Sequence, residues 1–253
     1  MIMISTGKIF RLKRLFEDDN RVFIVAMDHG VAGITEGLED LGKTIDIVAK
    51  SGADAVMINI GIVKNYQKDI AGRIGLVATT EYNERSIVEA VKVDASAVKT
   101  TYLGRVLPDD TVKDQIRQVG LVCDEWGMPY MAECIPAEPS GKLIFDVDLM
   151  KKAARLAGEL GADIVKSAYT GSRDGFRKVV EACPVPIVIA GGPRAESDKE
   201  NLKMVKDTID AGGAGVAIGR NIWQHRDPAK MTEAIAKIIH DNTSVEEALK
   251  ILK

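Results

Sequence analysis

The sequence of 253 residues is poor in cysteine, histidine and aromatic residues, and these shortages exclude several classes of protein. The cysteines are odd in number and lack the paired spacing of metal ligands, which argues against a disulfide framework and a zinc site. The few histidines are too scattered to suggest a metal site, so we expect no metal and no other cofactor. His29 and His225 fall in expected loops and are interpreted as surface polar groups. The complete set is Cys123, Cys134, Cys183, His29, His225 and His240.

Long hydrophobic runs and an excess of positive charge are also missing. No apolar stretch approaches the length that crosses a membrane, and charged residues interrupt residues 1–14, where a secretory signal would be apolar. The net charge is −3 with both signs interspersed, which does not indicate a basic surface for nucleic acid or anionic lipid. We therefore expect a cytoplasmic protein that binds neither nucleic acid nor membrane.

The chain does contain a regular alternation of helix and strand patterns, rich in Gly, Ala and aliphatic residues. Strands are expected at residues 21–30, 53–59, 74–80, 95–102, 130–136, 162–169, 187–192 and 213–221. Helices are expected at residues 8–16, 41–50, 62–67, 84–92, 112–126, 149–160, 175–182, 199–211, 229–240 and 244–252. Eight strands in a chain of this length predict an α/β fold, a closed (β/α)8 TIM barrel. We predict one domain over residues 1–253, with an extra N-terminal helix and an extra C-terminal helix; two small domains are the alternative. The N-terminal helix is expected either to close the bottom of the barrel or to pack on a neighbour.

A short repeat favours closure of the sheet. The segment Gly52-Ala53-Asp54-Ala55-Val56 recurs in degenerate form at residues 94–98, 161–165 and 212–216, each time where a helix ends and an even-numbered strand begins. Glycine suits the left-handed helix cap, and small residues let the helix and the barrel floor approach closely. The recurrence at even strands favours a barrel over an open, doubly wound sheet.

Lys166 stands near the end of a strand that is expected to be buried. Residues 162–165 are mostly apolar and follow a glycine, as in an interior strand of a parallel sheet. Because side chains alternate, Lys166 shares a face with Ala162 and Ile164, and in a closed barrel that face can be the interior. Burial favours the neutral amine that attacks a carbonyl, so one interpretation is a Schiff-base lysine. The other is a structural lysine that reaches the rim or pairs with a carboxylate.

Three further charged residues are expected at the same end of the barrel. Asp28 follows the first strand, where it can act as an acid, a base or a polarising group, or as the counter-ion of Lys166. If Lys99 points inward, two neighbouring ammonium groups lower each other's pKa, and Lys99 activates Lys166, contacts phosphate or is itself the nucleophile. If it points outward, it lies under a helix. Glu133 is either an inward acid or base or a partner of one of the lysines.

Glycine-rich loops follow the last two strands. Gly191 and Gly192 come after the seventh strand, and Gly219 and Arg220 come after the eighth. Loops at these two positions commonly bind phosphate in barrels, because glycine lets backbone amides reach an oxyanion and a short helix and an arginine add positive charge. We predict that these four residues contact a phosphate or a similar anion.

These motifs together resemble the archaeal-type class I fructose-bisphosphate aldolases and the related 2-amino-3,7-dideoxy-D-threo-hept-6-ulosonate synthases, of the DeoC/LacD type. The resemblance spans nearly the whole chain and is carried by Met27-Asp28-His29-Gly30, residues 163–171, residues 186–193 and residues 219–224. It implies a (β/α)8 barrel assembled into a ring-based homo-oligomer. It also implies that Lys166 is the Schiff-base lysine, that Asp28 is an acid/base or polarising residue, and that phosphate is contacted by Gly191, Gly192, Gly219 and Arg220.

The sequence departs from the family pattern in two places. The family has a proton-transferring tyrosine before the proline that ends the fifth strand, and here Ile135 precedes Pro136. The loop after the third strand is short, since Thr80 runs almost directly into the helix expected from Glu84, without the family's Gly-rich segment. Glu133 is a possible substitute for the tyrosine, and a thiolase-like branch of the family also lacks it.

The expected activity is that of a class I aldolase, in which Lys166 attacks the ketone of a phosphorylated ketose and a carboxylate moves the proton. A transaldol-type synthase or a thiolase-like acyl transferase is the alternative within the same chemistry. A barrel that binds a sugar phosphate without turnover is the alternative from another class, because isoleucine at position 135 transfers no proton.

Overall fold

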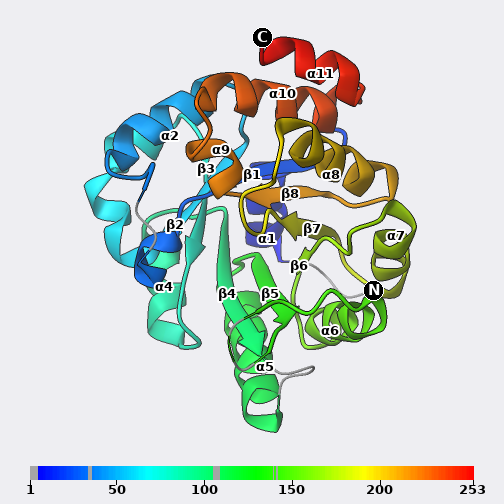
Figure 1. Ribbon diagram of the computed structural model, residues 1–253. Helices are drawn as coiled ribbons and strands as arrows, with labels where there is room; N and C mark the ends of the chain where they lie inside the picture. Colours follow the sequence, from blue (N-terminus) through cyan, green and yellow to red (C-terminus); the bar gives the residue numbers. More distant parts are fainter. Residues whose placement is uncertain (1–4, 34–35, 105–108, 139, 141) are drawn as a thin grey trace.

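The chain forms a closed barrel of parallel strands surrounded by helices, in a computed structural model that describes residues 5–33, 36–104, 109–138, 140 and 142–253 (Figure 1). The strands are β1 (Val22–Ala26), β2 (Ala55–Asn59), β3 (Gly75–Thr79), β4 (Ala97–Gly104), β5 (Tyr130–Pro136), β6 (Ile164–Ala168), β7 (Ile187–Ala190) and β8 (Gly215–Ile218). Each strand pairs with the next in sequence, and β8 pairs with β1. The predicted (β/α)8 architecture is confirmed.

Helices cover the outside of the barrel and connect the strands (Figure 1). The longer ones are α2 (Leu41–Lys50), α4 (Glu84–Lys92), α5 (Asp110–Glu125), α6 (Val147–Glu159), α7 (Arg173–Ala182), α8 (Asp198–Asp210) and α10 (Pro228–His240). The predicted C-terminal helix is present as α11 (Val245–Ile251), which packs on α10 and α8. In the part of the chain that the structure describes, no helix is both long and apolar enough to cross a bilayer. The assignment of the whole chain to one domain stays an interpretation.

Some expected boundaries are wrong for local reasons. Residues 62–67 are not an α-helix, because the connection after β2 is a 3-10 helix, η2 (Ile60–Asn65), followed by the short α3 (Gln67–Ile70). The last strand ends at Ile218 rather than Asn221. The carbonyl of Gly219 accepts hydrogen bonds from the next turn of backbone, which makes residues 220–223 the short helix α9 (Arg220–Trp223).

The N-terminal helix α1 (Thr6–Lys13) closes the bottom of the barrel, one of its two expected positions, although it begins and ends earlier than expected. The Ser5 side chain accepts a hydrogen bond from Lys8 N and so caps the helix. Leu15, just after the helix, is buried in the cluster that fills the barrel interior. The Lys8 ammonium is also buried, 2.5 Å from Asp124 Oδ1 and 2.7 Å from Asp163 Oδ2, where it ties α1 to the last turn of α5 and to the start of β6.

The aspartates of the sequence repeat hold strand starts in place. The Asp54 carboxylate accepts a 2.6 Å hydrogen bond from the backbone N–H of Phe23 at the start of β1. The Asp163 carboxylate accepts a 2.8 Å bond from the N–H of Tyr130 at the start of β5. Asp54 and Asp163 therefore each bind a backbone N–H at the start of the preceding strand.

The seam between β8 and β1 closes the barrel. Gly215 has a φ of +134°, and a side-chain carbon on it would collide with the backbone of Val22. Val22 N donates a 2.9 Å hydrogen bond to the carbonyl of Ala214 in the same place. Only glycine combines this backbone angle with so close an approach, so the seam depends on residue 215.

Candidate active site

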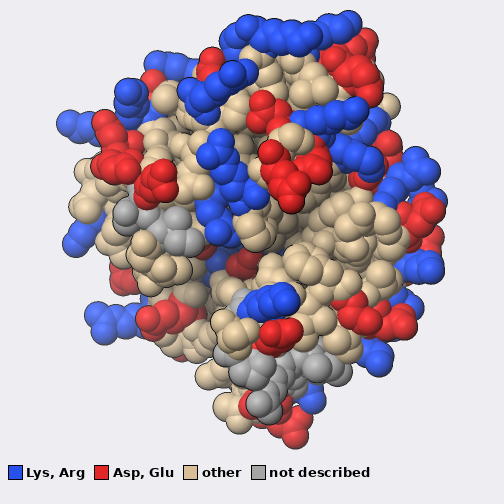
Figure 2. Space-filling view, in the orientation of Figure 1, with Lys and Arg blue, Asp and Glu red and all other residues tan. Residues whose placement is uncertain are grey.

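The carboxyl ends of the strands carry the polar residues that the sequence singled out. Figure 1 views the barrel from this end, with α9 and the connecting loops in front. On the same face, Figure 2 shows basic and acidic side chains intermingled around a hollow near the middle of the barrel. Since the two signs are mixed, the face has no large field of one sign, and any attraction for an anion is local.

Lys166 lies inside the barrel. Its side chain is buried, and its Nζ lies 2.7 Å from Glu133 Oε1 and 3.9 Å from Met57 Sδ, a side chain of the interior cluster. Glu133 and Lys166 are register partners on β5 and β6, and Met131 and Ile164, two residues earlier on these strands, belong to the same cluster. The lysine thus neither reaches the rim nor lies beneath a helix, and it is paired with a carboxylate.

Lys99 also points inward, where it joins two carboxylates. Its Nζ is 2.8 Å from Asp28 Oδ2 and 3.0 Å from Glu133 Oε2, and it donates a 2.5 Å hydrogen bond to Thr101 Oγ1. With Lys166, these groups form a buried cluster of two ammonium groups and two carboxylates. Each charge has an opposite charge in contact, which is the condition under which burial of ions is tolerated.

The cluster lowers carboxyl pKa values and raises that of Lys99. Burial alone raises the pKa of Glu133, but the charges of Lys166 and Lys99 lower it to about 2. Asp28 follows the same pattern, and Lys99 and Lys166 hold its pKa well below the usual value. Burial lowers the pKa of Lys99, yet Glu133 and Asp28 raise it well above the ordinary range. The expectation that Lys99 has a lowered pKa is therefore wrong, because two carboxylates outweigh one neighbouring ammonium.

Uncharged side chains that we did not single out from the sequence complete the cluster. Thr79 donates a 2.7 Å hydrogen bond to Asp28 Oδ2, and Asn59 donates a 3.0 Å bond to the Asp28 carbonyl. Thr101 donates a 2.9 Å bond to Glu133 Oε2. Asn59 and Thr79 are the last residues of β2 and β3, and Thr101 lies two residues after Lys99 on the same face of β4. Position at a strand end and period-two alternation were therefore the signals available in the sequence.

The loops after β7 and β8 are tied to each other. Arg220 Nη2 donates a 2.8 Å hydrogen bond to the carbonyl of Gly192, and Asn221 Nδ2 donates a 3.1 Å bond to the carbonyl of Gly191. The Nε of Arg220 is buried and has no hydrogen-bond partner among the described residues. The predicted anion-binding residues Gly191, Gly192, Gly219 and Arg220 therefore lie together, with one guanidinium N–H still available.

The two loop histidines are not simple surface groups. His225 is buried, its Nδ1 2.8 Å from the Asp227 carbonyl and its Nε2 3.3 Å from Asp198, so it links the starts of α8 and α10. His29 is half-buried, with Nδ1 3.7 Å from Asp28 Oδ1. Both lie against other loops at the carboxyl end of the barrel. The sequence showed only that each histidine falls in a loop, and not that a second loop covers it.

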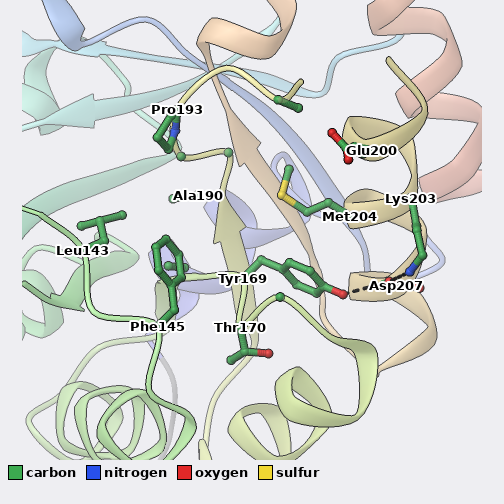
Figure 3. A pocket seen from close by; sticks show the side chains of 15 residues that line it. Leu143, Phe145, Tyr169, Thr170, Ala190, Pro193, Glu200, Lys203, Met204 and Asp207 are labelled. Atoms are coloured by element: carbon green, nitrogen blue, oxygen red, sulfur yellow. Dashed lines mark hydrogen bonds and ion pairs between the residues drawn. The ribbon is translucent and has the colours of Figure 1, made fainter. Parts of the chain in front are cut away.

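A cleft of about 520 Å³ opens beside the glycines of the β7 loop (Figure 3). Leu143 and Phe145 lie on one side and Tyr169 and Met204 on the other, as the figure shows. Tyr169 donates a 2.8 Å hydrogen bond to Asp207, which also pairs with Lys203. The wall nearest the barrel includes Ala168 and Ala190 at the ends of β6 and β7, so the cleft adjoins the end of β6, the strand that carries Lys166.

The arrangement provides an amine with a carboxylate in contact, at the same end of the barrel as the loops that are predicted to bind an anion. This is the set of groups that nucleophilic attack on a phosphorylated carbonyl compound requires. Over the described ranges, no cluster of three or more His, Cys, Asp or Glu side chains has a geometry that could hold a metal ion.

Comparisons with known proteins agree with this chemistry. Residues 22–225 match the model of the DeoC/LacD family aldolases. The chain is 37% identical over 262 residues to the 2-amino-3,7-dideoxy-D-threo-hept-6-ulosonate synthase of Halobacterium salinarum, covering 98% of this chain and 97% of the relative. It is 34% identical over 272 residues to an uncharacterised aldolase of Saccharolobus solfataricus, covering 98% of this chain and 99% of the relative.

A solved structure adds a chemical detail. An archaeal fructose-1,6-bisphosphate aldolase, with its catalytic lysine covalently bound to the carbinolamine intermediate of the substrate, superposes with a TM-score of 0.79 at 26% identity, over 92% of this chain and 99% of that one. The family match and the long, similar relatives leave one conclusion about ancestry and class. The chain belongs to the DeoC/LacD family of aldolases and is an enzyme of the class I, Schiff-base type.

Proposed function

We propose that this protein is a class I aldolase that cleaves and forms a phosphorylated ketose, with Lys166 as the Schiff-base nucleophile. The observation that carries the proposal is the buried amine of Lys166, which lies 2.7 Å from a carboxylate oxygen of Glu133 inside the barrel. The amine loses protons when it attacks a ketone, and a base in contact with it can accept one.

The other members of the charge cluster have supporting roles in this proposal. Glu133 accepts a proton from Lys166 on attack and returns one when the carbinolamine loses water. Lys99 and Asp28 keep the cluster neutral and aligned, because the Lys99 ammonium contacts both carboxylates. Lys99, held charged by those carboxylates, is a poor nucleophile and is not the residue that we expect to form the adduct.

The substrate's phosphate is proposed to bind at Gly191, Gly192, Gly219 and Arg220. The buried Nε of Arg220, without a partner among the described residues, supports this assignment. So does the hydrogen bond from Arg220 to the Gly192 carbonyl, which brings the β7 and β8 loops together. A guanidinium N–H and backbone amides are suitable donors for a phosphate oxygen.

Borohydride trapping tests the proposal. The protein is incubated with dihydroxyacetone phosphate or fructose 1,6-bisphosphate, reduced, digested and analysed by mass spectrometry. An adduct on the peptide that contains Lys166 is expected, and it should disappear in Lys166→Met but persist in Lys178→Met, a variant on the outer helix α7. An adduct on Lys99 would move the nucleophile. Failure of every tested ketose phosphate to form an adduct would favour a barrel that binds without turnover.

Transaldol transfer is the second candidate, and the 37% identity to a heptulosonate synthase favours it. Both reactions pass through a Schiff base, so trapping does not separate them. Release of glyceraldehyde 3-phosphate from fructose 1,6-bisphosphate and regeneration of free enzyme without any acceptor indicate the aldolase. A bound donor fragment that leaves only when a second carbonyl compound is added indicates the synthase.

The proposal includes a cytoplasmic location and assembly into a ring-based homo-oligomer. The absence of a one-sign charged field on the face in Figure 2 is consistent with a small-molecule substrate rather than a nucleic acid. Fractionation of the cells that produce the protein tests the location.

A further inference from the structure

We propose that His29 is the residue that moves protons to and from the substrate carbon and hydroxyl during carbon–carbon bond cleavage. This inference rests on the proposed aldolase function and adds to it a catalytic residue that the sequence interpretation had set aside. It assigns the proton transfer that Ile135, in place of a tyrosine, does not perform.

The carboxylates of the site are already committed. Glu133 contacts both Lys166 and Lys99, and Asp28 contacts Lys99 and accepts a hydrogen bond from Thr79. Both oxygens of Glu133 are in contact with a lysine nitrogen, which leaves neither of them free for a substrate hydroxyl. A group that titrates nearer to neutrality is better suited to this step.

The imidazole of His29 is held in place at the mouth of the site. Its ring lies edge-on to that of Trp223, with 5.5 Å between the ring centroids, and the Trp223 indole is fixed by a 2.9 Å hydrogen bond to the Ala26 carbonyl. A side-chain carbon on Gly219 would lie 2.8 Å from His29 Cε1, so the absence of a side chain there makes room for the ring.

The ring nitrogen Nδ1 of His29 is a buried polar atom without a hydrogen-bond partner among the described residues. It lies 3.7 Å from Asp28 Oδ1. That distance is too long for a hydrogen bond but suits an electrostatic contact that tightens when a proton arrives. Protonated His29 would thus have Asp28 as its counter-ion.

Charges from four elements act on His29. Asp28 precedes it on η1 (His29–Ala32), Glu133 is on β5, Lys166 is on β6 and Arg220 is on α9. Burial lowers the pKa of His29, Lys166 and Arg220 act in the same direction, and Asp28 and Glu133 oppose them. The pKa lies below the usual 6.5, so the imidazole is neutral and can accept a proton at neutral pH.

The proton balance of the step is simple. In the iminium formed with Lys166, neutral His29 takes the proton of the hydroxyl on the carbon β to the iminium carbon. The bond between the α and β carbons breaks, its electron pair passes to the iminium to give an enamine, and the aldehyde leaves. The imidazolium then gives its proton to the α carbon, which restores the iminium for hydrolysis.

Solvent exchange with the donor alone isolates this step. Dihydroxyacetone phosphate is incubated in deuterium oxide with wild-type protein, His29→Asn, His29→Gln and His225→Asn. NMR then follows the entry of deuterium at the hydroxymethyl carbon, which is the α carbon of the enamine. Asn and Gln reproduce the positions of Nδ1 and Nε2 but do not titrate. We expect both His29 variants to lose exchange and turnover by about 10²–10⁴-fold while borohydride still traps the Lys166 adduct. His225→Asn should exchange at the wild-type rate.

The outcomes separate this inference from the function on which it rests. Exchange that persists in both His29 variants overturns the proton-transfer role. Loss of the Lys166 adduct along with exchange overturns it too, because His29 would then act in binding. If wild-type protein forms no adduct with any ketose phosphate, the proposed aldolase function is refuted, whatever the role of His29. A fall in wild-type turnover as the pH drops below 6.5 supports the role if the residual turnover of His29→Asn does not fall over the same pH range.

Discussion

At the scale of single residues, the site depends on the ammonium of Lys99, which contacts two carboxylates at once. From the sequence, the period-two alternation put Lys166 on a face that could be the interior, but it did not decide whether Lys99 and Glu133 point inward. The direction of the Lys99 pKa was missed because Asp28, one of the partners that set it, comes from β1, across the barrel from β4.

Replacing Lys99 by Met should move the acid limb of the kcat profile upward by about one pH unit or more. Without the ammonium, the pKa values of Asp28 and Glu133 rise, and an uncompensated Asp28 also raises that of His29. Kinetics from pH 4 to 8 measure the shift, with Lys92→Met on the outer surface as control and a thermal melt to verify folding. A limb that stays in place or moves downward contradicts the arrangement.

His240 predicts a stability change at alkaline pH. Its Nδ1 lies 3.0 Å from Asp19 and its Nε2 3.2 Å from Asp54, and the Asp54 contact is the main cause that raises its pKa to about 9. The stabilisation is complete below pH 6.5, the unfolded value, and is lost as the pH rises through 9.

Unfolding in denaturant should show wild-type protein more stable than His240→Gln at pH 6, on the order of 1 kcal/mol after allowance for solvent screening. The difference should vanish near pH 10. A difference that is constant between these pH values would mean that the contact does not depend on the imidazolium charge.

At the scale of elements, a buried lysine of α1 ties this helix to two other elements of the barrel. Lys8 reaches Asp124 and Asp163, and Asp163 also holds the start of β5. The sequence allowed this helix to close the floor but did not show how, because Asp124 and Asp163 are distant in the chain and look like ordinary surface residues. Similarly, alternation predicted eight strands, whereas the turns after β2 and β8 are decided by local backbone hydrogen bonds that periodicity does not show.

Lys8→Met should lower the free energy of unfolding by about 2 kcal/mol, because it leaves two carboxylates facing each other without their cation. Lys13→Met, on the exposed side of the same helix, should change it little. Equilibrium unfolding followed by circular dichroism compares the two. Equal effects of both substitutions would show that helix propensity, rather than the buried contact, is responsible.

At the scale of the whole molecule, we expect the copies of the proposed homo-oligomer to meet at exposed apolar side chains of the barrel floor. Ile9 and Phe10 on α1 are 49% and 68% exposed, and Trp126 after α5 is 41% exposed. These three residues form the floor patch, since Arg11 Nη1 donates a 3.0 Å hydrogen bond to the Gly127 carbonyl between them. Exposed apolar groups of this kind commonly mark association surfaces.

We expect light scattering to give a mass that is a multiple of 27.4 kDa and that falls in Phe10→Asp. Val31→Asp, at the catalytic end and 82% exposed, should leave the mass unchanged. A wild-type mass equal to one chain would refute assembly, and an unchanged mass in Phe10→Asp would move the interface away from the floor patch.

The seam at Gly215 also fixes the order in which this enzyme becomes competent. Asp28 and His29 follow the first strand, whereas Gly219 and Arg220 follow the last, so the two halves of the site meet only when β8 docks on β1. A chain still emerging from the ribosome can therefore contain Lys166, Glu133 and Asp28 while it still lacks Gly219 and Arg220. Cellular metabolites can therefore react at a complete site only after the final sixth of the protein has been synthesised and β8 has paired with β1.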